Sequence, residues 1–159
     1  MASTRVQEGF SLIELLIVVA LIGIISAIAI PNLLASRRAA NEGSAQSSLR
    51  TITSCEQLYQ ASTGLGDYTD IAGLRGDFLT DSVLGSGSKS GYNFAAHPSA
   101  TGVRPALFYA TAIPSITSGV GQTGTRRFGV TQVGVIRADS TLTLPADATE
   151  VESMPPLGN

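Results

Sequence analysis

A run of apolar residues near the N-terminus is the feature that most limits how this chain can fold. No charged residue occurs from Leu15 to Ser36, and Leu, Ile and Val dominate the run. As a helix rising ~1.5 Å per residue, the segment from Phe10 to Ile30 is roughly 30 Å long, which matches the hydrocarbon core of a bilayer. We therefore expect a membrane-spanning helix in which small residues let neighbouring helices approach closely. These small residues are Gly23, Ser26, Ala27 and Ala29.

One carboxylate, Glu14, lies inside the apolar segment. A charged side chain in hydrocarbon costs about 3 kcal/mol or more, so Glu14 needs a partner, unless it lies at the membrane edge and reaches the interface. Cleavage between Gly9 and Phe10 would create an α-amino group one helical turn before Glu14, on the same face. That amino group could pair with the carboxylate of its own chain or of a neighbouring copy. The charge balance thus favours cleavage after Gly9 and a role for Glu14 in assembly.

A secretory signal peptide is the competing interpretation of the same segment. Ala27-Ile28-Ala29 looks like a small-residue cleavage site, and cleavage there would release a secreted soluble binding protein. However, the apolar part of a signal peptide is typically ~7 to 15 residues long, and this run is longer. Glu14 also interrupts its apolar character, and Pro31 closely follows the candidate site.

The N-terminal residues resemble the signature of type IV pilins and of the pseudopilins of type II secretion systems. The resemblance is ungapped and covers roughly residues 1 to 60. The residues that carry it are Gly9-Phe10-Ser11-Leu12-Ile13-Glu14-Leu15-Leu16-Ile17-Val18-Val19-Ala20, then Gly23, Ala27 to Pro31, and Asn32.

The resemblance implies specific roles for four residues. Gly9 and Phe10 would flank the bond that prepilin peptidase cuts, and Phe10 would become the N-methylated first residue. Glu14 would be the assembly glutamate of the family, and Pro31 its helix-kinking proline.

The sequence departs from the expected charge pattern in two places, the leader and the end of the apolar run. Arg5 is the one basic residue of the leader, where family leaders are often more basic, and Glu8 lies beside the cut. Arg37-Arg38 directly follow the apolar run, and the positive-inside rule alone would place that end in the cytoplasm. The resemblance implies the opposite orientation, and we follow it because the motif is longer and more specific.

The resemblance also implies partners and a location. The precursor would be a single-pass protein of the inner membrane, in contact with membrane lipid, and the mature chain would form a homo-oligomeric helical filament at the cell surface or in the periplasm. Prepilin peptidase, an inner-membrane assembly platform, an assembly ATPase and an outer-membrane secretin would act on it. No cofactor is expected.

The fold class expected is α+β, with one long N-terminal helix packed on a small antiparallel sheet of three to four strands. The predicted segments are a cleaved leader (1–9), a transmembrane assembly helix (10–35), an amphipathic helix half (36–63), a variable αβ loop (64–90), a sheet region (91–138) and an irregular or mobile C-terminal tail (139–159). Within the loop, Leu79 to Leu84 could form a short helical turn.

The periodicity beyond the span predicts which faces are buried. Apolar residues recur at spacings of three and four, as on one face of a helix, in the series Ala45, Leu49, Ile52, Cys55 and Tyr59. The expected strands are Gly91 to Ala96, Leu107 to Ala112, Arg126 to Thr131 and Val133 to Ala138. Their inner face would carry Tyr92, Phe94, Phe108, Phe128, Val130 and Val135. Pro31 predicts a bend or local melting near Ile28 to Asn32.

Other candidate chemistry is sparse. A net charge of −2 with scattered arginines gives no basic stripe for a nucleic acid. The sequence from Gly85 to Ser90 lacks the Lys position of a phosphate-binding loop, and the lone His97 has no cysteine partner for a catalytic dyad. Cys55 has no partner for an intramolecular disulfide. Four loop aspartates leave a calcium site open, although their spacing is not that of an EF-hand: Asp67, Asp70, Asp77 and Asp81.

The function predicted is structural, that of a filament subunit, and not enzymatic, because no nucleophile and base converge in the sequence. A pilin is preferred over a pseudopilin because no calcium-site pattern is evident. The lone cysteine also means that the C-terminal disulfide loop of many major pilins is absent. Adhesion, motility, DNA uptake, secretion and electron transfer all remain open as the task of the filament.

Overall fold

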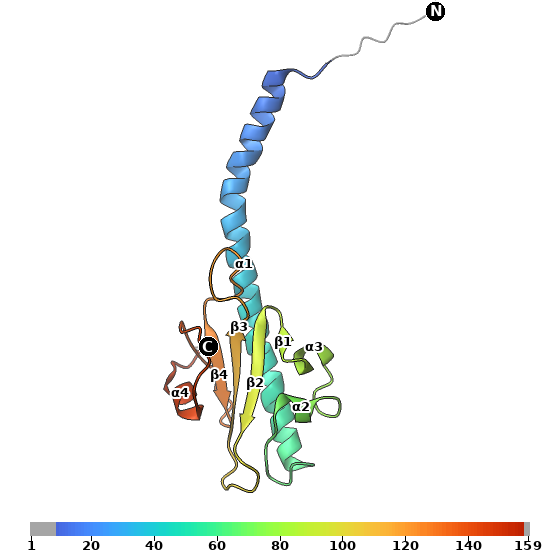
Figure 1. The fold of residues 1–159 in the computed structure, drawn as a ribbon, viewed down its shortest axis with the longest axis vertical. Helices are drawn as coiled ribbons and strands as arrows, with labels where there is room; N and C mark the ends of the chain where they lie inside the picture. Colours follow the sequence, from blue (N-terminus) through green and yellow to red (C-terminus); the bar gives the residue numbers. More distant parts are fainter. Residues whose placement is uncertain (1–8, 158–159) are drawn as a thin grey trace, which may run out of the picture. The chain divides into compact units, whose positions relative to one another are not determined.

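The computed structural model describes residues 9–157 and divides into two compact units, residues 1–36 and 37–159. A single α-helix, α1 (Leu12–Ala61), contributes to both units. We describe each unit by itself. The element order in Figure 1 is the long helix first, then two short helices, five strands and a final short helix.

The first unit is the N-terminal part of α1. None of its described residues is buried, and the large aliphatic side chains are mostly half or more exposed. The helix continues through Pro31. The expected local melting near Ile28 to Asn32 is therefore not observed in the isolated chain, where the residues on both sides of the proline remain helical.

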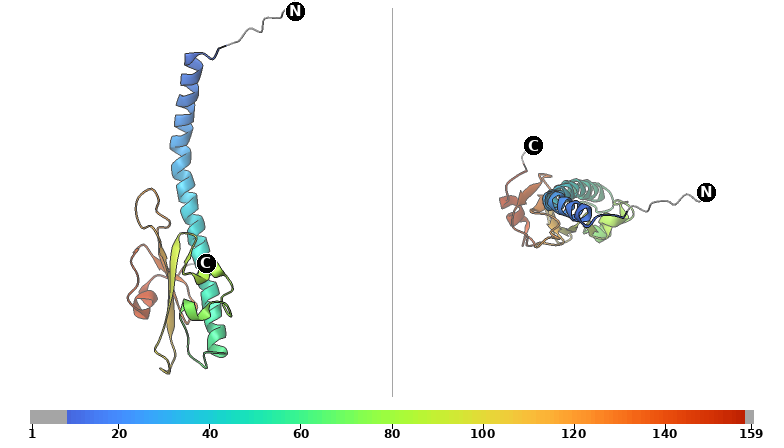
Figure 2. Two further views of the ribbon diagram at one scale, coloured as in Figure 1. Left: turned by 45° about the vertical axis from the view of Figure 1, so that its right-hand side comes forward. Right: turned by 90° about the horizontal axis from the view of Figure 1, so that it is seen from above.

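The second unit contains the rest of α1 and everything after it. Two one-turn helices follow, α2 (Ile71–Leu74) and α3 (Ser82–Gly85). The sheet is a five-stranded antiparallel meander in the order β1-β2-β3-β4-β5 (Figures 1 and 2). Its strands are β1 (Ser88–Lys89), β2 (Tyr92–Pro98), β3 (Phe108–Pro114), β4 (Arg127–Thr131) and β5 (Arg137–Asp139). The fold class is thus α+β, as predicted, with one more strand than expected.

The core lies between α1 and one face of the sheet. The predicted helix stripe is confirmed, because Ala45, Leu49, Ile52 and Cys55 are buried and Tyr59 packs partly against them. From the sheet, five of the six predicted inner residues are buried in the same cluster: Tyr92, Phe94, Phe108, Phe128 and Val130. Long-range apolar contacts therefore hold residues 37–61 of α1 on the sheet.

Val135 is the exception, with 41% of its surface exposed. The predicted strand Val133 to Ala138 begins instead at Arg137. The residues before it form a turn in which Gly134 has a φ of 80°, a conformation that glycine adopts without strain. Because this turn delays the strand, Ile136 is the residue that enters the core.

The C-terminal segment differs from the expected irregular tail. It contains α4 (Ala148–Ser153), and buried Val151 packs on the face of β4 opposite to the core. A Cβ on Gly129 would lie 2.7 Å from a methyl group of Val151, so the absence of a side chain at Gly129 permits this contact. Asp147 is the N-cap residue of this helix, and its carboxylate accepts the Glu150 N–H at 2.8 Å. This cap stabilises the start of a helix in a segment where the prolines had predicted irregular structure.

One buried ion cluster supports the same face. The guanidinium of Arg127, with 3% of its side chain exposed, binds Asp139 at 2.8 Å and Glu150 at 2.7 Å. It also donates to the Thr143 carbonyl at 2.9 Å. These contacts join β4, β5 and α4, which explains why residues 139–157 are folded against the sheet.

Candidate processing and assembly site

The start of α1 forms a reciprocal capping box. The Ser11 N–H donates to Oε2 of Glu14 at 2.9 Å, and the Glu14 N–H donates to the Ser11 hydroxyl oxygen at 3.2 Å. The Ser11 carbonyl also accepts the first helical hydrogen bond, from Leu15 at 3.3 Å, so Ser11 is the N-cap residue. Two backbone N–H groups that would otherwise lack partners are satisfied in this way.

The capping box gives Glu14 an intrachain role that the sequence analysis did not assign. The pattern Ser-x-x-Glu, here Ser11 to Glu14, is the signal that could have revealed it. Both N–H donors lie on the C-terminal side of the bond between Gly9 and Phe10. Cleavage of that bond would therefore leave the capping box in place.

The residues of the predicted cleavage site precede the helix. Gly9 and Phe10 both lie outside α1, and 78% of the Phe10 surface is exposed. A peptide bond that is exposed and lies outside a helix is accessible to a peptidase. The local structure is thus compatible with the predicted cut.

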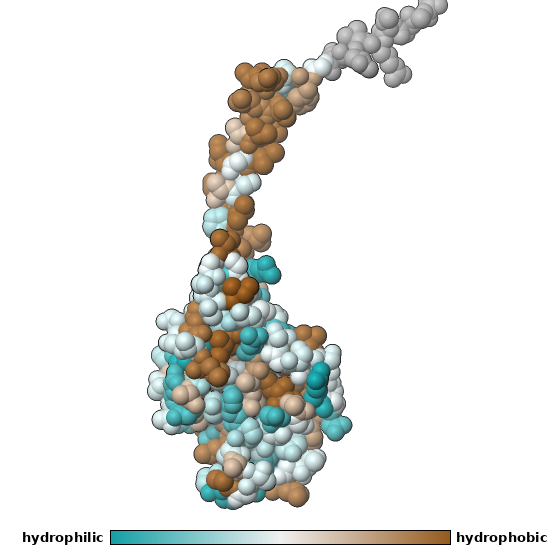
Figure 3. All heavy atoms as spheres, in the orientation of Figure 1, coloured by the Kyte–Doolittle hydropathy of each residue, from teal (hydrophilic) through white to brown (hydrophobic). Residues whose placement is uncertain are grey.

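The helix residues that follow present an apolar surface on every side. Figure 3 shows apolar side chains along the first unit, and none of the described residues there is buried. The segment is long and apolar enough to cross a membrane, by length and composition. A helix that is apolar on all sides is unfavourable in water, so it is normally covered by lipid or by protein.

The N-terminal segment matches a known family motif. Residues 4–30 match the model of the prokaryotic N-terminal methylation motif. This is the segment on which the resemblance to type IV pilins and pseudopilins rests. The matched residues include Gly9, Phe10 and the part of α1 that carries Glu14.

A curated relative gives a second match. The type IV wide pilus major component PilA4 of Thermus thermophilus is 46% identical over 56 residues, which is 35% of this chain and 43% of that protein. The chain thus matches less than half the length of this relative. No solved structure gave a significant match.

Two glutamates, Glu42 and Glu56, lie on the buried face of α1 and were not predicted from the sequence. Glu42 accepts hydrogen bonds from the Thr125 N–H at 2.8 Å and from the Arg126 guanidinium at 2.8 and 3.0 Å. Burial alone would raise the pKa of Glu42, but the Thr125 and Arg126 contacts outweigh it and lower the pKa. The partners of Glu42 lie more than 80 residues away in the sequence, so only the folded chain brings these groups together.

Glu56 is fully buried beneath the segment that follows α1. Its Oε2 accepts the Thr69 N–H at 3.0 Å, while no partner for Oε1 is found in residues 9–157. Burial raises the pKa of Glu56 to about 7, the Thr69 contact opposes the shift, and the charge of Asp70 adds to it. Glu56 and Cys55, whose thiol donates to the Phe78 carbonyl at 3.2 Å, both hold this segment on the helix.

Three of the four loop aspartates have structural partners. Asp67 pairs with Arg104, Asp70 caps α2 by accepting the Gly73 N–H, and Asp81 caps α3 and binds Lys89 at 2.7 Å. In the described part of the chain, no group of three or more His, Cys, Asp and Glu residues could hold a metal ion.

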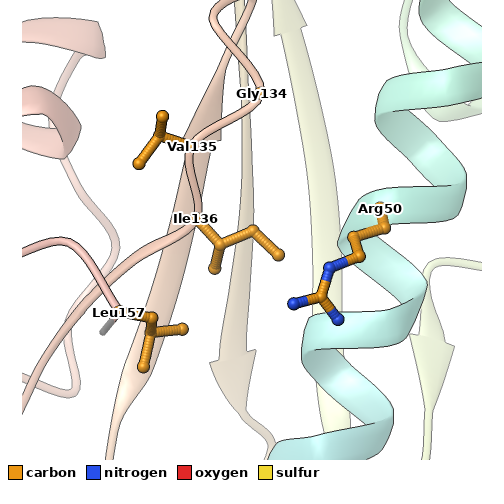
Figure 4. A pocket seen from close by; sticks show the side chains of 5 residues that line it. All are labelled: Arg50, Gly134, Val135, Ile136 and Leu157. Atoms are coloured by element: carbon orange, nitrogen blue, oxygen red, sulfur yellow. The ribbon is translucent and has the colours of Figure 1, made fainter. Parts of the chain in front are cut away.

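An open pocket of about 400 Å³ lies between α1 and the turn before β5 (Figure 4). The Arg50 side chain extends toward Ile136 from one side, and Leu157 lies below Ile136. The lining residues are Arg50, Gly134, Val135, Ile136 and Leu157. Arg50 is the one ionisable residue among these five, so they provide no pair of groups for acid–base catalysis.

The buried carboxyl of Glu56 predicts a pH-dependent stability. The folded chain retains a proton on Glu56 that the unfolded chain has already lost between about pH 4.5 and pH 7, so the free energy of unfolding falls as the pH rises through this range. Glu56→Gln, which stays neutral, should remove this decline, a relative gain on the order of 3 kcal/mol above pH 7.

Unfolding of the full chain in detergent micelles, followed by near-ultraviolet circular dichroism from pH 4 to 8, measures this difference. Glu152→Gln removes an exposed acid as the matched control. Parallel pH profiles for the wild type and Glu56→Gln would contradict the assignment.

Proposed function

We propose that this chain is a pilin, the structural subunit of a type IV pilus-like filament. The precursor inserts in the inner membrane, prepilin peptidase cuts it between Gly9 and Phe10, and the new N-terminus at Phe10 is methylated. The mature chain then assembles through its N-terminal helix, with an assembly platform and ATPase acting on it. The observation that carries the proposal is the uncovered apolar helix that begins at the Ser11–Glu14 capping box, within the matched motif.

We propose that Glu14 fixes the register between the helices of neighbouring subunits. Its carboxylate accepts the capping hydrogen bond from the Ser11 N–H through Oε2. Apolar helices slide past one another with little change in energy, whereas an ion pair in a low-dielectric environment is strong and specific in position. Pairing of this carboxylate with the α-amino group of Phe10 on a neighbouring copy would therefore fix the stagger between helices.

Two substitutions separate the charge of Glu14 from its capping role. Glu14→Gln keeps a capping side chain but removes the charge, whereas Ser11→Ala removes the cap and keeps the charge. We expect Glu14→Gln to insert in the membrane and to lose most surface filaments. Ser11→Ala should retain them, with a helix end weakened by about 1 kcal/mol.

Sheared surface fibres, quantified by electron microscopy with a gene deletion as the blank, measure the effect. Membrane fractionation of each variant controls for insertion. Wild-type amounts of filament from Glu14→Gln would exclude the charge-pairing role, and loss in Ser11→Ala alone would assign the effect to the cap.

Pro31 is proposed as the point at which α1 adjusts during assembly. Its ring removes one backbone hydrogen bond from a helix that is otherwise continuous in the isolated chain. We expect filament maps to show a bend or an unwound turn at residues 28–32 that Pro31→Ala lacks. A straight helix in both filaments would contradict this role.

A pseudopilin of a type II secretion system is the alternative within the same family. The similarity to a protein named as a pilus component favours the pilin. The deletion strain distinguishes them: loss of surface fibres supports a pilin, and loss of protein secretion with fibres retained supports a pseudopilin. A secreted binding protein, cut after Ala29, is a weaker alternative because that cut would remove most of the matched motif.

A further inference from the structure

The segment 115–125, which we call the β3–β4 loop, is uncharged and carries two exposed apolar side chains. Arg126, the one residue between this segment and β4, is paired with Glu42. Val120 is 75% exposed and Ile116 is 48% exposed. All other residues of the loop are Gly, Ser, Thr or Gln. A loop without charges pays little desolvation free energy on entering a membrane interface, because it has no ion to remove from water.

Hydrogen bonds close the neck of this loop and fix it to α1. The Thr123 N–H donates to the Ile116 carbonyl at 3.0 Å, and the Asn41 side-chain amide donates to the Thr123 carbonyl at 2.9 Å. Gly91 packs against the same point, where a Cβ would lie 2.8 Å from the Thr123 side chain. The loop is thus held beside Asn41 and extends beyond the strand ends (Figures 1 and 2).

Two arginines lie on α1 about one helical turn before Asn41. Arg37 is exposed, and Arg38 is half-buried with an Nε that has no hydrogen-bond partner in the described part of the chain. Neither pairs with a carboxylate among residues 9–157. A guanidinium binds phosphate oxygens through paired N–H donors, and the apolar run ends at Ser36, directly before this pair.

We propose that the β3–β4 loop and Arg37-Arg38 together form a membrane-contact surface for the unassembled subunit. Val120 and Ile116 enter the bilayer interface, and the two guanidinium groups bind the phosphates of anionic lipids. This inference rests on the proposed function, because it requires that residues 10–35 span the membrane. Continuity with the span selects lipid as the occupant, since residue 37 follows the last residue of the uncharged run.

Site-specific fluorescence tests the contact. In a Cys55→Ala background, Val120→Cys and Val133→Cys each carry an environment-sensitive label. Val133 is the matched control because it is also an exposed valine (70%) and follows the opposite end of β4. The full chain is reconstituted in vesicles of phosphatidylcholine and phosphatidylglycerol that contain a lipid with a nitroxide near its headgroup.

We expect several-fold stronger quenching at position 120 than at position 133, with emission shifted to the blue at 120 alone. Arg37→Gln with Arg38→Gln, or vesicles without phosphatidylglycerol, should reduce that quenching. Equal quenching at both positions would overturn the proposal. A blue shift that appears only at high protein-to-lipid ratio, without quenching by the lipid nitroxide, would assign the loop to a second copy and also overturn it.

Carbonate extraction separates this inference from the proposed function. Release of the chain by carbonate would contradict the membrane span and the lipid contact together. A chain that resists carbonate but shows no quenching at position 120 would contradict the contact alone.

Discussion

The exposed apolar surface of residues 12–36 is the feature of this protein that most needs an apolar environment outside the chain. The described residues of this segment have no cover within the chain, so the surface needs either a bilayer or other copies of the same helix. Lipid and packed helices are almost equally apolar, and the transfer between them costs little. Within this surface Glu14 is the charged residue, which is why we propose it as the source of specificity between helices.

The three glutamates on α1 lie among apolar side chains, and each carboxyl group is accommodated differently. Glu14 accepts a hydrogen bond from a backbone N–H at the start of its own helix, and Glu42 forms an ion pair with Arg126. The pKa of Glu56 is raised to about 7, so this carboxyl group is largely protonated below neutral pH. The latter two stabilise the contact of α1 with distant segments. Glu14 is the one of the three that lies in the uncovered apolar segment.

Sequence reasoning recovered the features that depend on local patterns. The apolar run, the stripe from Ala45 to Cys55 and most of the inner sheet face follow from spacing alone, because burial repeats with the period of the element. The ion pair of Glu42 with Arg126 could not be predicted, since its partners are far apart in sequence and a single chain gives no register. The capping box at Ser11 and the N-cap at Asp147 could have been predicted from the sequence. Glu14 was interpreted by its charge instead, and the prolines near α4 indicated an irregular tail.

The N-terminus of the mature subunit tests the central claim most directly. Sheared surface filaments, or the membrane fraction if fibres are sparse, are digested and the first peptide of this chain is identified by mass spectrometry. The account predicts a chain that begins at Phe10 with a methylated amino group, next to the intact Ser11–Glu14 capping box. A mature chain that retains Met1, or one that begins after Ala29, would contradict it.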